Sequence, residues 1–250
     1  GSTFVEGGEP SFNELLPNVG AVYALTEQWR VYASYSEGFS MPDVGRVLRG
    51  ISTPGLSINN FLNLQPVIAD NEEVGVEYRG NAVSASVSYF RSGSDLGARL
   101  QADADGIYSV KREKTEIDGF ELSAEYALSS DTAFGLNYAD TDGEYDSNAD
   151  GSVDTQLGGN NIAPKRANLY WSQQWSGMIS SQVQWNKLFD RDIYSGGQAI
   201  NNFDGYNTID ASVLIETRDL GNFSVGVENL LDEFYFTYYA QTVGPGSSNF

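Results

Sequence analysis

The connections between strand-like segments constrain the fold of this chain most, because short and long connections alternate along its length. Five connections are tight and contain turn-favouring Gly, Asn, Ser, Thr or Asp; they lie at 26–28, 79–81, 128–131, 175–177 and 217–222. The connections between them are long and acidic or rich in glycine, and they cover 40–70, 93–112, 142–163 and 190–206. In an antiparallel meander, this order places every tight turn at one end of the sheet and every long loop at the other.

The segments between these connections alternate apolar and polar residues, as strands with one apolar and one polar face do. We predict ten strands, at Pro17–Thr26, Trp29–Phe39, Asn71–Arg79, Ala82–Ser92, Glu113–Leu128, Thr132–Thr141, Pro164–Trp175, Gly177–Phe189, Asn207–Thr217 and Asn222–Leu230. The last two form a hairpin with an apolar face of Ile209, Val213, Phe223 and Val227 and a polar face of Asp210, Glu216 and Glu228.

This pattern fits either a soluble antiparallel sandwich or solenoid, or a membrane barrel. No run of about 18 apolar residues could form a transmembrane helix, so a β-barrel is the only membrane-spanning structure open to the chain. Loops longer than about 12–15 residues at every second connection are uncommon in compact soluble domains. Aromatic residues also lie near apolar strand ends, as an interfacial girdle requires; they are Trp29, Phe39, Tyr78, Tyr89, Trp171, Trp175, Trp185 and Phe189. We therefore predict an all-β fold, an antiparallel up-and-down transmembrane β-barrel, with apolar faces toward lipid and polar faces toward a wet lumen.

The composition argues against several function classes. The 34 acidic and 14 basic residues give a formal net charge of -20, whereas nucleic acid binding requires a basic stripe. The chain has no His and no Cys, which removes zinc sites, disulfides, thiol nucleophiles and His-based acid-base catalysis. Glu121 and Glu125 share a strand face, but no nucleophile motif accompanies them, so we interpret them as part of a hydrated wall. We predict that the protein is not an enzyme.

Several stretches resemble the C-terminal half of TonB-dependent outer-membrane siderophore receptors. They are Val31–Phe39, Met41–Arg46, Asp70–Tyr78, Ile117–Leu122, Ala163–Leu169 and Gly226–Tyr235. The resemblance implies a 22-stranded barrel plugged by an N-terminal domain. Residues 1–250 would then be a partial barrel domain of about ten strands, the twelfth to the twenty-first. We expect the plug domain to be absent, because no segment of the sequence resembles it. We expect the last strand to be absent as well, because 243–250 ends in Phe but shows no alternation.

The resemblance also implies a function. Such a receptor binds a ferric siderophore at its extracellular face and imports it with TonB-derived energy, and it requires no cofactor. The implied partners are the ferric siderophore, the TonB complex through the absent plug, and lipid of the bacterial outer membrane. The stretch from Gly38 to Arg49 resembles receptors for citrate- or hydroxamate-type siderophores. The alternative is a self-contained small outer-membrane barrel, or a β-rich adhesin or structural surface protein.

Ligand-binding candidates follow from this implied function. Ferric siderophores are mostly anionic, and arginine pairs well with carboxylate or hydroxamate oxygens. We therefore expect binding residues among the Arg and Tyr side chains of the long connections and outer strand ends: Arg46, Arg49, Arg99, Tyr108, Arg112, Arg191, Tyr194, Tyr238 and Tyr239. For each of them, an ordinary loop salt bridge or a girdle position is the alternative.

The loop 146–154 matches the first nine positions of an EF-hand calcium loop. The oxygen donors are Asp146, Asn148, Asp150 and Asp154, with Gly151 at the sharp turn. Leu157 stands where the bidentate Glu of an EF-hand belongs, and no flanking helices are predicted, which excludes a complete EF-hand. We expect either a weaker Ca²⁺ site that orders this loop or a solvated acidic turn. A shorter acidic segment with a similar pattern lies at 103–106.

Overall fold

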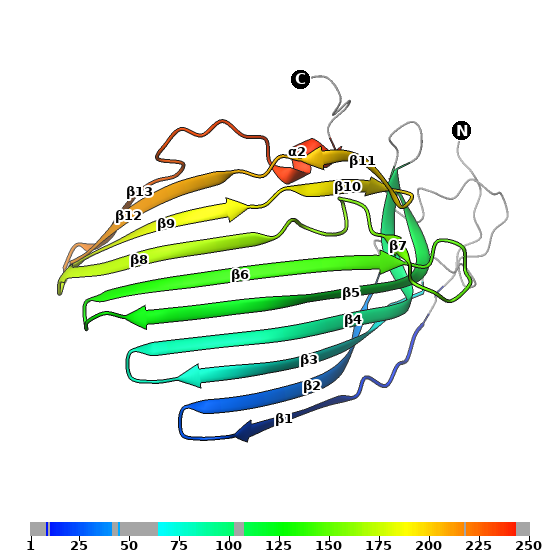
Figure 1. The fold of residues 1–250 in the computed structure, drawn as a ribbon, viewed down its shortest axis with the longest axis horizontal. Coiled ribbons are helices and arrows are strands. Elements are labelled where there is room, and N and C mark those ends of the chain that lie inside the picture. The colour runs from blue at the N-terminus through cyan, green and yellow to red at the C-terminus, as the bar shows by residue number, and fades with distance from the viewer. Residues whose placement is uncertain are drawn as a thin grey trace.

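The computed structural model describes residues 9, 11–41, 45, 65–102, 108–217 and 219–243. They form a large antiparallel sheet in which each long strand pairs with the next along the chain (Figure 1). Its long strands are β1 (Asn18–Ala24), β2 (Trp29–Ser40), β3 (Val67–Arg79), β4 (Val83–Ala102), β5 (Tyr108–Ala127), β6 (Thr132–Tyr145), β8 (Arg166–Ser176), β9 (Ile179–Leu188), β12 (Asn207–Thr217) and β13 (Gly221–Val227). The short β7 (Thr155–Gln156) pairs with the end of β6, while β10 (Arg191–Ser195) and β11 (Gln198–Phe203) form a separate hairpin.

The predicted antiparallel, up-and-down fold is confirmed, and each predicted strand corresponds to one long strand of the sheet. The tight turns gather at one end of the sheet and the long connections at the other (Figure 1). In the β12–β13 turn, the Thr217 hydroxyl accepts a hydrogen bond from the Leu220 N–H at 3.1 Å and donates one to the Gly221 carbonyl at 2.7 Å. Gly221 has a φ of 90°, a conformation that glycine adopts without steric cost.

The long connections contain more structure than predicted. The predicted loop 93–112 is wrong over most of its length, because β4 runs on to Ala102 and β5 begins at Tyr108. A register shift between Ser94 and Gly97 interrupts their pairing, and such a bulge breaks the period-two pattern that marks a strand. The predicted loop 190–206 contains β10 and β11.

The described chain also contains the short helix α2 (Tyr238–Val243). No helix in the described ranges is long and apolar enough to cross a membrane. We expected the chain to end before a closing strand, on the basis of its last residues. The segment 244–250 lies outside the described residues.

The strand register separates the side chains into two faces, because directly paired residues lie on the same side of a sheet. We call the apolar face of the sheet the outer face. One of its rows consists of Trp29, Tyr78, Ala85, Ala124, Leu136, Leu169, Trp185 and Ile209. We call the polar face the inner face, and its adjacent row consists of Arg30, Glu77, Ser86, Ser123, Asn137, Asn168, Asn186 and Thr208. The predicted hairpin faces are confirmed, since Ile209, Val213, Phe223 and Val227 lie on the outer face.

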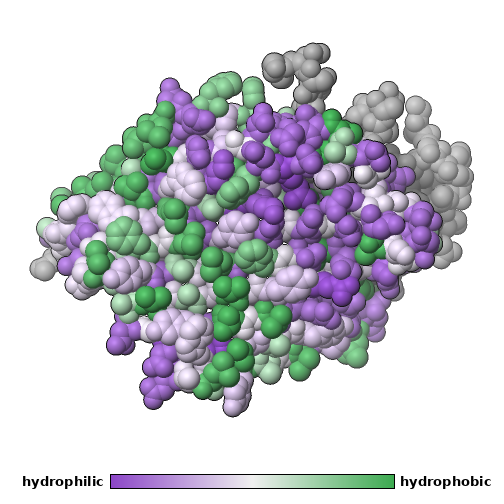
Figure 2. All heavy atoms as spheres, in the orientation of Figure 1, coloured by the Kyte–Doolittle hydropathy of each residue, from purple (hydrophilic) through white to green (hydrophobic). Residues whose placement is uncertain are grey.

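The outer face is not packed against a protein core. Large apolar side chains stay exposed along it, among them Val87, Phe120, Phe134, Val213 and Phe223. Buried hydrophobic residues of the described chain lie instead near the long connections: Tyr145, Leu157, Ile162, Ile193 and Phe203. Figure 2 agrees, because hydrophilic residues gather toward the end with the long connections and hydrophobic residues spread over the part nearer the tight turns. This arrangement differs from a soluble sandwich, in which a second sheet covers the apolar face.

Candidate functional site

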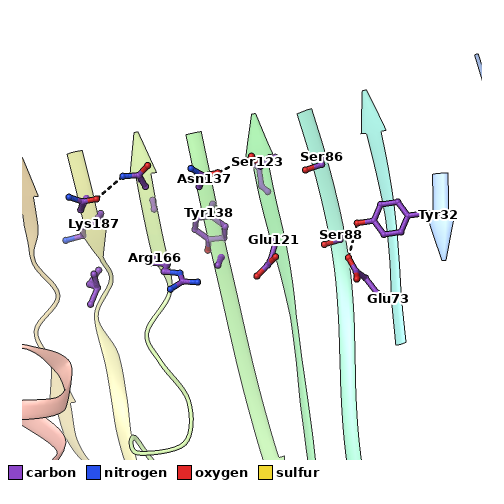
Figure 3. A pocket seen from close by; sticks show the side chains of 16 residues that line it. Tyr32, Glu73, Ser86, Ser88, Glu121, Ser123, Asn137, Tyr138, Arg166 and Lys187 are labelled. Carbon is purple, nitrogen blue, oxygen red and sulfur yellow. Dashed lines mark hydrogen bonds between the residues drawn. The ribbon is translucent and has the colours of Figure 1, made fainter. Parts of the chain in front are cut away.

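The inner face holds a hollow of about 430 Å³ that is lined by β2 to β6, β8 and β9 (Figure 3). At one side of it, the Tyr32 hydroxyl donates a hydrogen bond to Glu73 Oε1 at 2.9 Å. Tyr32 is paired with Gly75, and a methyl group on Gly75 would overlap the Tyr32 ring. The ring thus fills the space that a side chain at position 75 would need, which brings its hydroxyl to Glu73.

A second tyrosine on the inner face uses the same arrangement. Tyr170 is paired with Gly135, where a methyl group would overlap the Tyr170 ring. Its hydroxyl donates to Glu125 Oε2 at 2.8 Å. Each glycine thus makes room for a tyrosine whose hydroxyl holds a carboxylate of the inner face, Glu73 or Glu125. The sequence predicted Glu121 and Glu125 as wall residues but gave no sign of the Tyr–Gly–Glu pattern, which depends on strand register.

Hydrogen bonds link the polar row across neighbouring strands. Ser123 donates to Asn137 Oδ1 at 3.0 Å. Asn168 donates to Asn186 Oδ1 at 2.8 Å, and Asn186 donates to Asp210 Oδ2 at 2.7 Å. By contrast, Glu121 and Arg166 line the hollow (Figure 3), and their side chains have no ion pair or hydrogen bond within the described part of the chain. These two charges are available to a partner inside the hollow.

The outer mouth, meaning the end with the long connections, is held by two apolar clusters. In the first, Tyr145, Leu157 and Ile162 pack together with Ile117. In the second, Phe203 is fully buried, with its ring centroid 5.0 Å from that of Tyr238. These clusters bring the 146–163 connection, the β10–β11 hairpin and α2 together.

Contacts between these connections are close. The Tyr238 hydroxyl donates to the Ile162 carbonyl at 3.0 Å. A methyl group on Gly159 would lie 2.8 Å from Thr242 Cγ2 and 2.9 Å from the Tyr238 oxygen, so only glycine fits there without displacement. Burial raises the pKa of Tyr238, and Arg191 partly offsets the increase.

Two of the predicted ligand-binding arginines are engaged within the chain. Arg99 is 7% exposed, donates to both carboxylate oxygens of Glu113 at 2.6 and 3.1 Å, and lies 4.0 Å above the Tyr145 ring centroid. Arg191 donates to Asp142 Oδ1 at 3.1 Å and to the Thr141 carbonyl at 3.2 Å. Both guanidinium groups therefore stabilise the mouth.

Arg112 is different, because two of its guanidinium nitrogens, Nε and Nη1, are buried and have no hydrogen-bond partner. Nη2 donates to the Pro66 carbonyl at 2.9 Å. Burial lowers the pKa of this guanidinium, since charge is disfavoured away from water. An anion at Nε and Nη1 would satisfy both donors.

The other predicted residues do not form one described site. Tyr194 is half-buried in β10, and Tyr239 is 72% exposed. Tyr108 begins β5, while its side chain lies outside the described part. Arg46 and Arg49 lie outside the described residues, as does the acidic segment 103–106.

The loop 146–154 curls around the buried Asp146. Asp146 Oδ1 accepts hydrogen bonds from the Asn148 and Asp150 N–H groups at 3.2 Å each, and Oδ2 accepts one from Gly151 at 2.7 Å. The pKa of Asp150 is lowered by the Ser152 N–H and by Asn148. In the described ranges, no three His, Cys, Asp or Glu side chains gather closely enough to hold a metal ion. Calcium binding by this loop stays a prediction.

Comparison with known proteins gives consistent results. The family model "TonB dependent receptor-like, beta-barrel" matches residues 1–230. The ferric aerobactin receptor of Klebsiella pneumoniae is 28% identical over 97% of the chain and 34% of that receptor, and the pesticin receptor of Yersinia enterocolitica is 24% identical over 95% and 34%. The chain spans about a third of the length of these relatives.

Solved structures show the same fold. The copper transporter OprC has a TM-score of 0.73 at 17% identity, covering 88% of this chain and 34% of that chain. The ferric yersiniabactin uptake receptor FyuA from Yersinia pestis has a TM-score of 0.62 at 18% identity, covering 87% and 32%. At these identities the likeness concerns the fold alone.

Proposed function

This chain belongs to the TonB-dependent receptor β-barrel family, and on that basis we propose that it forms part of the wall of an outer-membrane receptor for a ferric siderophore. The receptor binds the ferric siderophore at its outer mouth and imports it with energy supplied through TonB. The relatives carry this proposal, since proteins named ferric aerobactin receptor match 97% and 92% of the chain. The family match favours this function over an adhesin or a self-contained small barrel.

The two faces of the sheet support the proposal. The exposed apolar outer face suits the lipid of the bacterial outer membrane, and the polar inner face suits a water-filled lumen. In barrels of this kind the short turns are periplasmic and the longer loops extracellular. The outer mouth of this chain therefore lies on the extracellular side, where a ligand arrives.

Arg112 supports a site for an anionic ligand. A guanidinium donates strong hydrogen bonds to carboxylate or hydroxamate oxygens, and Nε and Nη1 of Arg112 are unoccupied donors. We assign ligand contact to Arg112, with Arg46, Arg49, Tyr108, Tyr194 and Tyr239 as further candidates. We assign Arg99, Arg191 and Tyr238 to holding the mouth in shape, because each already has a partner in the chain.

The hollow of the inner face is proposed to receive the plug domain that the family resemblance implies. Glu121 and Arg166 offer one negative and one positive charge to such a partner. Contact with TonB would be made through the plug, not through the residues described here.

Ligand binding by the complete purified receptor tests the proposal. Titration with ferric aerobactin, followed by quenching of tryptophan fluorescence, should give saturable binding, with ferric citrate and ferric enterobactin as comparison ligands. Saturable binding of any one of these three chelates supports a ferric siderophore receptor. Absence of binding to all three, with an intact receptor by thermal unfolding, overturns it.

A further inference from the structure

The segment 229–243, which follows β13 and which we call the strap, connects the edge of the sheet to the outer mouth. It leaves the sheet after β13 and ends in α2, which lies beside β11 (Figure 1). The middle of the strap is open to its surroundings, since Leu231 is 69% exposed and Phe234 is 84% exposed. Its two ends, by contrast, are held by contacts with other elements.

The first end of the strap is tied to the inner wall. The Asn229 N–H donates to Asp210 Oδ1 at 2.8 Å, and Asp210 Oδ2 accepts a hydrogen bond from Asn186, which lines the inner hollow. The Asn229 side chain donates to the Glu233 carbonyl at 2.9 Å and accepts a hydrogen bond from the Glu233 N–H at 3.0 Å. These bonds close a bend in which Asn229 and Asp232 have φ values of 51° and 54°.

The second end of the strap is docked at the outer mouth. Tyr238 packs on the fully buried Phe203 and donates its hydroxyl hydrogen to the Ile162 carbonyl. Just before α2, the Tyr235 ring stacks on Tyr206, with centroids 3.9 Å apart and an interplanar angle of 19°. The packed aromatic surface of the strap is therefore concentrated at this end.

The two ends depend on each other through the backbone of the strap. A positive φ at Asn or Asp costs free energy, and such conformations persist only where surrounding contacts hold them. The contacts of α2 fix the far end of the strap and so hold the bends at Asn229 and Asp232. If α2 leaves the mouth, the bends can relax, which moves the Asn229 N–H away from Asp210. Because few side chains of the strap are packed, this opening costs less free energy than opening the sheet.

We propose that the strap docks and releases as one unit, so that it couples the packing of the outer mouth to the hydrogen bonds of the inner wall. In the docked state, α2 covers Phe203 and the Asn229 N–H holds Asp210. In the released state, both contacts are lost together. The inference rests on contacts within the chain, so it stands whether or not the receptor takes a ferric siderophore.

A disulfide that fixes the second end tests the proposal in the complete receptor. A Cβ added at Gly159 would lie 2.8 Å from Thr242 Cγ2, so a sulfur in the place of Cγ2 is within reach of a second cysteine. The chain contains no Cys and offers no competing thiol. In Gly159→Cys/Thr242→Cys, oxidation should slow hydrogen exchange about tenfold or more at 157–163 and also at 229–233, relative to the reduced form.

A matched disulfide elsewhere in the sheet controls for general stabilisation. A Cβ added at Gly20 would lie 3.6 Å from Ser34 Cβ, which suits a disulfide between β1 and β2. Oxidised Gly20→Cys/Ser34→Cys should leave exchange at 157–163 and 229–233 unchanged. Equal slowing by both disulfides overturns the proposal, as does slowing at 157–163 alone, because the two ends of the strap would then open independently.

Asn229→Ala tests the coupling from the other end. It removes both side-chain bonds to Glu233 and strains the bend, so exchange at 157–163 should be about fivefold faster, the equivalent of one hydrogen bond. Asn81→Ala, in the tight turn between β3 and β4, should leave exchange at 157–163 unchanged. Thermal unfolding identifies any variant that fails to fold. Unchanged exchange at 157–163 in folded Asn229→Ala overturns the proposal.

Discussion

The ring of Tyr32 occupies the space above Gly75 on the neighbouring strand, and this places its hydroxyl 2.9 Å from Glu73 Oε1. A methyl group at position 75 must displace the ring, so Gly75→Ala should break the hydrogen bond to Glu73. We expect a loss of about 1 kcal/mol, the usual contribution of such a bond, measured as a lower midpoint of thermal unfolding of the complete receptor.

A double-mutant cycle separates this effect from general strain. Adding Tyr32→Phe to Gly75→Ala should cost little more, because the hydrogen bond is already lost. Gly38→Ala is the matched control in β2, since its methyl group would meet Asn71 Nδ2 at 3.5 Å, an ordinary contact. Additive losses in the cycle would contradict the Tyr–Gly–Glu account.

Tyr238→Phe should loosen the outer mouth and change its response to alkaline pH. The substitution keeps the ring against Phe203 but removes the hydrogen bond to the Ile162 carbonyl. Because the folded-state pKa of Tyr238 is raised above 10.0, its stabilising effect is present below about pH 10 and is lost as pH rises through the folded pKa. Hydrogen exchange at 157–163 should be faster in the variant, and its stability should fall less between neutral pH and pH 11. Identical pH profiles would contradict this role.

Asp146→Asn should destabilise the loop 146–154. The Asp146 carboxylate accepts three backbone hydrogen bonds, and weakening charge-assisted bonds to a buried group costs about 1–3 kcal/mol. Limited proteolysis should cut the variant loop faster. If calcium binds here, millimolar Ca²⁺ should protect the wild-type loop but not the variant, whereas absence of protection in the wild type would retire the calcium prediction.

Arg112→Gln and Arg99→Gln should have opposite consequences. Arg112 keeps two buried donors without a partner, so its substitution should weaken ferric siderophore binding by about tenfold or more while leaving the unfolding midpoint unchanged or higher. Arg99 is held by Glu113 and Tyr145, so its substitution should lower the unfolding midpoint. Unchanged affinity in Arg112→Gln would remove this residue from the site.

The strand order and the two faces could be predicted because alternation and turn residues are local signals. The extension of β4 and β5 could not, since the bulge between Ser94 and Gly97 shifts the alternation. That bulge also sets the register that brings Arg99 to Glu113. The sequence analysis proposed Arg99, Arg112 and Arg191 for the mouth. Whether each is paired, as Arg99 is, or unpaired, as Arg112 is at two nitrogens, depends on contacts between distant segments.

Iron uptake by intact cells tests the central claim most directly. Cells without their own siderophore receptors would carry the complete receptor and be supplied with radioactive iron as the chelate that binds it in vitro. We expect iron to accumulate in cells with functional TonB and to remain at the level of surface binding in otherwise identical cells without TonB. Equal accumulation in both strains, or none in either despite binding, would contradict TonB-driven import of a ferric siderophore.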